Sequence, residues 1–291
     1  VNLMIVPFRA PRSAALYRRL WTDDGSPLLN NLEKLVAAMR VEAGENCDVI
    51  GAMRYGKPSL EEVFRHVAVE GYDEIIIFPL FPQYASSTTG SVHELVMRLA
   101  SRMNVIPSLR FISQYYSHPR FIEAWAENIG QYNPEDHDHI LFSYHSLPIR
   151  QVERSHPGLA AASCDCAVSM PEHGKYCYRA ACYETTRLIA ARLGLKEGTY
   201  STAFQSRLTG NWLSPFTDQA LQNLAAAGRK NVLVAAPSFT ADCLETIIEI
   251  GDEYRQLFRQ AGGGDMVMAH SLNDNPLWIN AIAEIARLKG N

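Results

Sequence analysis

Apolar and polar positions follow two patterns that alternate along the chain: short, nearly continuous apolar runs, and longer segments with apolar residues three or four apart. The short runs predict β-strands at residues 48–53, 74–80, 108–113, 138–144, 200–205, 231–236 and 265–269. The longer segments predict α-helices at residues 27–41, 60–69, 91–102, 119–128, 178–193, 217–227, 242–260 and 277–288. Strands that alternate with helices indicate an α/β protein with parallel, doubly wound sheets.

The order of these features is repeated in the two halves of the chain. A proline, a predicted helix, a glycine and an apolar strand follow one another in each half, and thirteen residues separate Pro58 from Gly71 and Pro215 from Gly228. We therefore expect two similar α/β lobes, residues 1–128 and 129–291. Ligands of such folds bind at the carboxyl ends of the strands, so the active-site cleft is expected between the lobes. We also expect the final helix to pack back on the first lobe.

The composition and charge of the chain exclude some classes of function. Of the 291 residues, 47% are hydrophobic and 20% charged, as in an ordinary globular protein, and a net charge of −4 gives no basic surface for nucleic acid. The sequence has no apolar run of the roughly 18 residues that span a bilayer and no recognisable signal peptide. We therefore expect a cytoplasmic location, with peripheral contact at the inner membrane left open. Residues 1–9 are predicted to be a core strand. Oligomeric state is left open.

Two titratable residues follow predicted strands and are the first candidates for chemistry. His145 follows the strand predicted at residues 138–144, where a neutral imidazole can accept a proton. Glu245 begins the helix predicted at 242–260, and Glu249, Asp252 and Glu253 continue an acidic row along that helix. Such a row is either a solvated helix face or a set of oxygen ligands for a divalent cation.

Polar turns and aromatic side chains lie near the same strand ends. Residues 82–91 combine Tyr84 with a run of hydroxyl groups that includes Ser87 and Thr88, which suits an anion at a helix start. Arg54 and Arg207 could each bind a substrate carboxylate or form an ordinary salt bridge. The aromatic residues near these strand ends are Tyr55, Phe81, Tyr84, Trp212 and Phe239, and as a group they favour a pocket for a flat apolar ligand.

Four of the six cysteines fall close together in a predicted insertion, residues 160–183. They are Cys164, Cys166, Cys177 and Cys182. In a chain without an export signal, such a group indicates a metal or cluster site rather than disulfides. Four thiolates suit a Zn²⁺ ion or an iron–sulfur cluster.

Several motifs, in order along nearly the whole chain, resemble those of ferrochelatases, the enzymes that insert ferrous iron into a porphyrin. They are Phe142-Ser143-Tyr144-His145-Ser146-Leu147-Pro148, Pro82-Gln83-Tyr84 with Ser87-Thr88-Thr89-Gly90-Ser91, Gln205-Ser206-Arg207 with Trp212-Leu213, Phe239-Thr240 with Glu245-Thr246, and Ser271-Leu272-Asn273-Asp274-Asn275-Pro276-Leu277. The resemblance starts after the first strand and Gly-Gly-Pro turn of that family, so we expect a strand and one lip of the cleft upstream of Val1.

The resemblance implies a role for each matching residue. It implies that His145 and Glu245 face each other across the porphyrin as catalytic and metal-binding residues, with Glu249 and Glu253 on a metal or proton path. It implies substrate contacts from the positions Arg54, Tyr55, Tyr84, Ser87, Thr88, Trp212 and Phe239.

It further implies that Fe²⁺ and a porphyrin, protoporphyrin IX or a relative, are the substrates. A [2Fe–2S] cluster on the four cysteines is implied in the same way, with Zn²⁺ as the alternative.

The chain departs from the family pattern at Cys243, where many members have histidine, and at Phe81, where some have tyrosine. A thiol is a poorer proton relay than an imidazole, so the departure at Cys243 bears on proton exit. Two other functions stay open at this point: a tetrapyrrole chelatase for cobalt or another metal, and a tetrapyrrole-binding protein without catalytic activity.

Overall fold

The computed structural model describes residues 16–156 and 158–288, so the strand expected at residues 1–9 lies outside the described residues. The strands are β1 (Ile75–Ile77), β2 (Leu109–Phe111), β3 (His139–His145), β4 (Tyr200–Gln205), β5 (Asn231–Ala235) and β6 (Asp265–Met268). The α-helices are α2 (Pro27–Ala43), α3 (Leu60–Val67), α4 (Thr89–Ala100), α5 (Pro119–Gly130), α6 (Ile149–Glu153), α7 (Tyr178–Leu193), α8 (Thr217–Ala226), α9 (Arg255–Gln260) and α10 (Pro276–Ile285).

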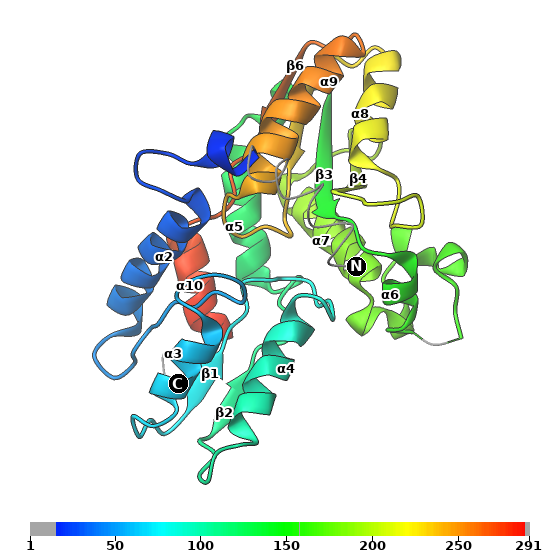
Figure 1. The fold of residues 1–291 in the computed structure, drawn as a ribbon. Coiled ribbons are helices and arrows are strands. Elements are labelled where there is room, and N and C mark those ends of the chain that lie inside the picture. The colour runs from blue at the N-terminus through cyan, green and yellow to red at the C-terminus, as the bar shows by residue number, and fades with distance from the viewer. Residues whose placement is uncertain (1–15, 157, 289–291) are drawn as a thin grey trace.

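The larger sheet has the strand order β4-β3-β5-β6, with every pair parallel, as predicted (Figure 1). Its central strand β3 is buried on both faces. Ile140 and Phe142 join the apolar cluster that contains α5 and α7 side chains, and Leu141 joins the one that contains α8 and α9 side chains. This alternation follows from the two-residue repeat of a strand, and it explains why the sequence of β3 is apolar almost throughout.

The smaller sheet pairs β1 with β2 in parallel, and α3 and α4 pack together beside it (lower part of Figure 1). The strand predicted at residues 48–53 does not form, and this prediction is wrong. These residues run without a paired strand, except for an isolated bridge between Met53 and Ser59. Apolar sequence alone does not make a strand, because the backbone donors and acceptors also need a partner at ladder distance.

The repeat noticed in the sequence has a structural counterpart. Met53 N donates to Pro58 O at 2.7 Å, and Phe204 N donates to Pro215 O at 2.8 Å, so an equivalent backbone contact to a proline precedes α3 and α8, although the second closes a longer loop than the first. After each of these helices the chain turns through a glycine with positive φ, 79° at Gly71 and 82° at Gly228. Such φ values strongly favour glycine, which accounts for its recurrence at this point.

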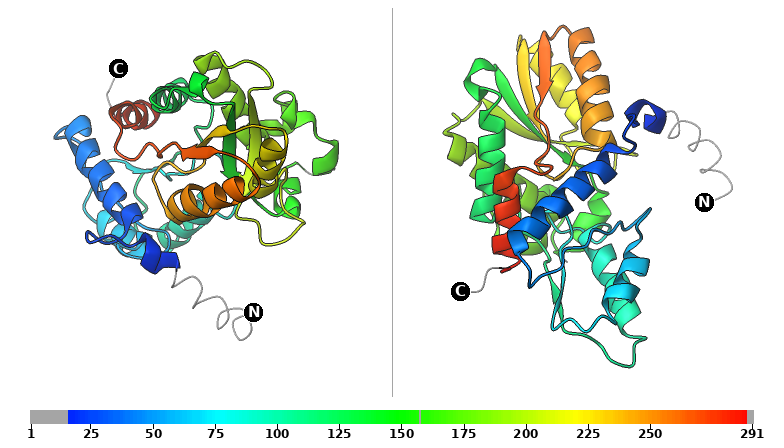
Figure 2. Two further views of the ribbon diagram at one scale, coloured as in Figure 1. Left: turned by 90° about the horizontal axis from the view of Figure 1, so that it is seen from above. Right: turned by 90° about the vertical axis from the view of Figure 1, so that its left-hand side faces the viewer.

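The last helix lies against helices from the first half of the chain. α10 contacts α5 and α2, and Figure 2 shows α2 and α10 side by side. Trp278 of α10 is fully buried, with ring contacts to Tyr115 at 5.5 Å and Phe121 at 5.7 Å. This apolar cluster continues into the face of β3 and includes Phe78 and Ile112, which follow β1 and β2, whereas the side chains of β1 and β2 belong to a separate cluster with α3 and α4.

The helix predicted at 242–260 forms with a different geometry. Its first part is the π-helix η5 (Glu245–Tyr254), and only its last part, α9, is an α-helix. No helix in the described part of the chain is both long and apolar enough to span a lipid bilayer.

Candidate active site

His145 is the last residue of β3 and is half-buried. Its Nδ1 lies 2.6 Å from Ser146 O. Because a carbonyl oxygen only accepts, Nδ1 carries the proton in this contact, and the lone pair of a neutral ring is then on Nε2. The backbone is held as well, since His145 N donates to Ser238 Oγ at 3.2 Å and His145 O accepts from Tyr178 Oη at 2.8 Å. His145 is therefore a fixed imidazole, and its Nε2 makes no hydrogen bond within residues 16–156 and 158–288.

Two aromatic rings flank His145. The ring centroid of Trp212 lies 6.4 Å from that of His145, and the centroid of Phe239 lies 6.3 Å from it. Trp212 reaches this position because the chain around it pairs with the residues that follow β3, through Leu213 N to Leu147 O at 2.9 Å. Phe239 belongs to the connection between β5 and the π-helix. Residues predicted from three separate motifs are thus brought together around one imidazole.

Glu245 opens the π-helix at the end of the same connection, and its neighbour Cys243 is a buried thiol. Burial, and then the nearby Glu245 carboxylate, raise the pKa of Cys243 well above its usual range. Cys243 is therefore a neutral thiol.

Asp242 holds this connection in place, and sequence reasoning missed it. Its buried carboxylate accepts hydrogen bonds from Ser271 N at 3.0 Å, Thr246 Oγ1 at 3.1 Å, His270 Nδ1 at 2.9 Å and Asn273 Nδ2 at 2.9 Å. Burial alone would raise the pKa of Asp242, but the hydrogen bonds from Asn273 and Ser271 and the charge of His270 lower it overall. The available signal was the motif at residues 271–277, which supplies two of these partners, Ser271 N and Asn273 Nδ2.

The acidic row on the π-helix has two different environments. Glu249 is fixed, because it accepts from Ser206 N at 2.9 Å, from the Ser206 hydroxyl and from Tyr254 Oη at 2.7 Å. Asp252 and Glu253 are about 40% exposed and face Arg19, which forms an ion pair with Asp252 and lies 3.6 Å from Glu253. Part of the acidic charge is therefore balanced by an arginine distant in the sequence.

The π-helix also changes how these acids line up. In an α-helix with 3.6 residues per turn, every step of four residues drifts around the axis. The i to i+5 hydrogen bonds of a π-helix put more residues in each turn, so a step of four comes closer to one full turn. Glu245, Glu249 and Glu253 therefore lie four residues apart on a helix with wider turns than the α-helical prediction implied.

The predicted substrate-binding residues of the first half form a second group. Arg54 Nε donates to Ser91 Oγ at 2.9 Å, and its guanidinium lies 4.6 Å from the ring centroid of the exposed Tyr55. Tyr84 contacts the ring of Tyr176 at 6.0 Å.

The hydroxyl groups in the turn at residues 82–91 make two different kinds of contact. Ser87 Oγ accepts from Gln151 Nε2 at 3.0 Å, and this contact links the turn to α6, shortly after His145. Thr88 Oγ1 donates to Ala85 O at 3.3 Å.

Arg207 forms an ordinary internal ion pair. Its guanidinium makes a two-point contact with the Asp218 carboxylate, with Nη2 to Oδ2 at 2.8 Å, and lies 4.0 Å from the ring centroid of Phe216. Of the two alternatives that the sequence left open for Arg207, the structure has the salt bridge.

The four clustered cysteines are all buried and unpaired. The neighbouring Cys177 thiol, and then burial, raise the pKa of the Cys166 thiol. The Cys166 thiol that donates to Cys177 lowers the pKa of Cys177, and the N–H of Ala180 at the start of α7 lowers it further. Cys182 lies deeper and contacts Tyr178, whose hydroxyl group bonds to His145 O. The cysteines and His145 are thus connected through Tyr178.

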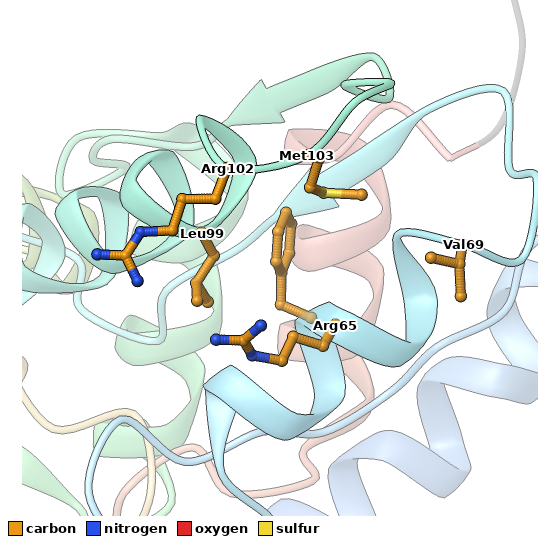
Figure 3. Close-up of a pocket in the computed structure, with 6 residues that line it drawn as sticks. Arg65, Val69, Leu99, Arg102 and Met103 are labelled. Carbon is orange, nitrogen blue, oxygen red and sulfur yellow. The ribbon is translucent and has the colours of Figure 1, made fainter.

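Two cavities lie away from His145 and the other candidate site residues. One, of about 210 Å³, lies between α3 and α4 and is lined by Phe64, Leu99, Met103, Val69, Arg65 and Arg102 (Figure 3). The other, of about 570 Å³, adjoins it, because Val69 and Met103 line both. They lie where α3 and α4 lead into the amino ends of β1 and β2, on the side opposite to the carboxyl ends, and neither is lined by a predicted site residue.

Two solved structures with a similar fold come from metal chelatases. SirB from Bacillus subtilis with Fe³⁺ aligns with a TM-score of 0.60 at 14% identity, over 90% of this chain and 91% of that chain. The sirohydrochlorin chelatase SirB in complex with cobalt gives a TM-score of 0.60 at 13% identity, over 92% and 91%. The chain therefore shares its fold with SirB, a sirohydrochlorin chelatase.

The sequence comparisons identify the protein family. The family description Ferrochelatase matches residues 1–289. The ferrochelatase of Legionella pneumophila (strain Lens) is 37% identical over 98% of this chain and 85% of its own length, and that of Coxiella burnetii (strain Dugway 5J108-111) is 39% identical over 99% and 81%. The chain belongs to the ferrochelatase family.

Proposed function

We propose that this chain inserts Fe²⁺ into protoporphyrin IX, or a closely related porphyrin, to form haem with release of two protons. The observation that carries the proposal is the half-buried His145 with Trp212 at 6.4 Å and Phe239 at 6.3 Å between ring centroids. A flat apolar macrocycle suits the aromatic side chains, and a neutral imidazole suits a substrate that must lose protons. Family membership supports the same conclusion.

In this proposal His145 is the proton acceptor for the pyrrole nitrogens. Its Nδ1–H is bound to Ser146 O, so Nε2 is the atom that receives a proton. Glu245 acts from the opposite face of the macrocycle, where its carboxylate is an oxygen ligand for Fe²⁺ and an acceptor for the second proton. A bent macrocycle, with strain of about 1–5 kcal/mol, would turn the nitrogen lone pairs out of the ring plane toward the metal.

Glu249 and Glu253 are proposed as the path for metal or protons to and from Glu245. Their spacing at intervals of four residues from Glu245 along one helix supports this role, because a proton or a hydrated cation can pass between successive carboxylates. Glu249 would be the fixed member, since Ser206 and Tyr254 hold its carboxylate. Glu253 would be the outer member, next to Arg19.

The cleft is proposed to lie between residues 1–128 and 129–291, with the propionates of the porphyrin on the first lobe. Arg54, Tyr55 and Tyr84 would contact the substrate, and the guanidinium of Arg54 keeps its Nη donors available beyond its bond to Ser91. Ser87 and Thr88 would add hydroxyl donors. The contact between Gln151 and Ser87 supports a shared wall, because it joins the two predicted lobes.

The cysteines are proposed to hold a [2Fe–2S] cluster, with Zn²⁺ as the alternative metal. Four buried free thiols form a suitable donor set. Within residues 16–156 and 158–288, no group of three or more His, Cys, Asp or Glu side chains is already arranged to hold a metal ion. Bound there, the cluster would supply a rigid cross-link for the loop at 160–183. No step of metal insertion is assigned to it.

Cys177→Ser tests the cluster. The iron–sulfide charge-transfer absorbance of the wild-type protein is expected to be lost in this variant, whereas one bound Zn²⁺ per wild-type chain would overturn the iron–sulfur assignment.

The chain is proposed to work in the cytoplasm, where its free thiols would stay reduced. Peripheral contact with the inner membrane would ease exchange of an apolar porphyrin.

Anaerobic assay with protoporphyrin IX and Fe²⁺ tests the activity. Haem formation is expected for the wild-type protein and its loss for His145→Ala, while a control at the exposed His66, His66→Ala, stays active. Tight porphyrin binding without haem formation would show a tetrapyrrole-binding protein instead. Turnover with sirohydrochlorin and Co²⁺ but not with protoporphyrin and Fe²⁺ would show a different chelatase.

A further inference from the structure

The imidazole of His145 has a single hydrogen bond in the part of the chain that the structure describes, between Nδ1 and Ser146 O at 2.6 Å. Ser238 and Tyr178 also contact His145, but they bond to its backbone N–H and carbonyl group. These two contacts do not determine which ring nitrogen carries the proton. That choice therefore depends on how firmly the carbonyl group of Ser146 is held.

Ser146 is held from two sides and is fully buried. Its N–H donates to Gln205 O at 2.8 Å, which continues the pairing of β3 with β4 beyond His145. Its hydroxyl group donates to Leu213 O at 2.9 Å, in a segment that is not part of the sheet. Ser146 is thus the residue at which the chain passes from its pairing with β4 to contact with the segment around Leu213.

This second segment also carries Trp212, and it pairs with the residues that follow Ser146. Leu213 N donates to Leu147 O at 2.9 Å, and an isolated antiparallel bridge joins Pro148 to Trp212. The hydroxyl group of Ser146 adds a further contact between the same two segments. Because the carbonyl group of Ser146 lies in the rigid peptide plane that leads to Leu147, anchors on both residues fix its direction.

We propose that Ser146 is a positioning residue for the proton transfer proposed for His145. Its hydroxyl bond to Leu213 O holds the carbonyl group that accepts from Nδ1, and this keeps Nε2 as the nitrogen that can accept a proton. The same bond holds the peptide next to Trp212, whose ring centroid lies 6.4 Å from that of His145. The inference rests on the proposed function, because it concerns the atom of His145 that receives a proton.

Ser143 provides a matched comparison near the end of the same strand. Its hydroxyl group is also fully buried, but it bonds to the side chains of Gln205 and Thr217 rather than to the segment around Leu213. Loss of either serine hydroxyl group removes buried hydrogen bonds and should lower stability. Only the loss at Ser146 is expected to release the imidazole of His145.

The test uses the full-length chain with ¹⁵N-labelled histidine. Long-range ¹H–¹⁵N spectra at alkaline pH distinguish a ring with its proton on Nδ1 from one with its proton on Nε2, and the His145 signals are those missing in His145→Gln. Ser146→Ala removes the hydroxyl donor, and Ser146→Thr keeps it with one added methyl group. Ser143→Ala is the control, and haem formation is measured for every serine variant.

Wild-type His145 is expected to carry its proton on Nδ1 only. Ser146→Ala should show both tautomers in exchange and a kcat for haem formation lower by about 10-fold, because the imidazole is then fixed in neither tautomer nor orientation. Ser146→Thr should recover the wild-type tautomer and most of the lost kcat. Ser143→Ala should lower the melting temperature and leave the tautomer of His145 unchanged.

Two results would overturn the inference. Wild-type His145 with its proton on Nε2 would contradict the bond to Ser146 O, and Ser146→Ala with the wild-type tautomer and kcat would show that Ser146 only stabilises the fold. Absence of haem formation by the wild-type protein would instead contradict the proposed function, while the tautomer, which needs no substrate, still tests Ser146. If thermal unfolding shows that Ser146→Ala does not fold, Ser146→Cys, with a weaker donor of similar size, decides the question by the same spectra and assay.

Discussion

Replacement of Asp242 by alanine tests how the connection that carries Glu245 is held. The carboxylate accepts four hydrogen bonds at 2.9–3.1 Å. Removing it leaves the buried Ser271 N–H without an acceptor, at about 1–3 kcal/mol. The Thr246 hydroxyl group keeps only its contact with Cys243 O at 3.3 Å, and the lost bond costs about 1 kcal/mol. The bond to Asn273 adds about 1 kcal/mol. The bond to His270 counts for little, because the His270 side chain is 74% exposed and solvent screens it.

The expected loss of unfolding free energy for Asp242→Ala is therefore about 3–5 kcal/mol. For a chain of this size the melting temperature should fall by about 10 °C. Urea unfolding followed by circular dichroism measures the difference. The matched control is Asp252→Ala, whose side chain is 40% exposed and pairs with Arg19 at the surface, and whose expected cost is below about 1 kcal/mol.

The same carboxylate makes stability depend on pH, with a defined sign. The hydrogen bonds that outweigh burial lower the pKa of Asp242 in the folded protein. A carboxyl group with a lowered folded pKa contributes its full stabilisation above its ordinary pKa of about 3.9 and loses it as the pH falls below that value. Asp242→Asn should lack this component. The reasoning is refuted if Asp242→Ala costs no more than Asp252→Ala.

The remaining predictions concern single contacts. Tyr178→Phe removes the hydrogen bond to His145 O and should cost about 1 kcal/mol of unfolding free energy and lower haem formation, whereas unchanged kcat would separate Tyr178 from the site. Glu249→Gln leaves the Ser206 N–H and Tyr254 hydroxyl group with a neutral partner, so we expect about 1–2 kcal/mol lower stability and a slower proton or metal step, seen as a fall in kcat at unchanged KM for porphyrin. Trp125→Ala at a fully buried position should cost about 3–5 kcal/mol, and a change below 1 kcal/mol in thermal unfolding would contradict the assigned core.

Much of the secondary structure could be predicted because its cause is local. β4 (Tyr200–Gln205) and α7 (Tyr178–Leu193) begin and end at the predicted residues. Their apolar residues repeat with the period of the element, and turn residues mark their ends. The strand predicted at residues 48–53 does not form, because strand formation is not a local property. A strand exists only where another strand lies beside it to pair with its backbone groups.

Residue types at strand ends also indicated the candidate site. His145, Trp212 and Phe239 were each named from the sequence, because carboxyl ends of parallel strands share one edge of a sheet. Their contact around one imidazole depends on register, which the pairing of Tyr144 with Phe204 and of Phe142 with Ala235 establishes.

The sequence by itself therefore determined the α/β class, the family and the residues that could carry the chemistry, because periodicity and motifs are properties of neighbouring positions. Only the tertiary structure decided which partner each polar group has. It pairs Arg207 with Asp218, places Arg19 beside the acidic row, surrounds Asp242 with four donors and puts His173 Nε2 3.4 Å from Cys164 Sγ. These outcomes depend on distances between residues far apart in the chain, and hydrogen bonds and charges act at a range that only the folded backbone defines.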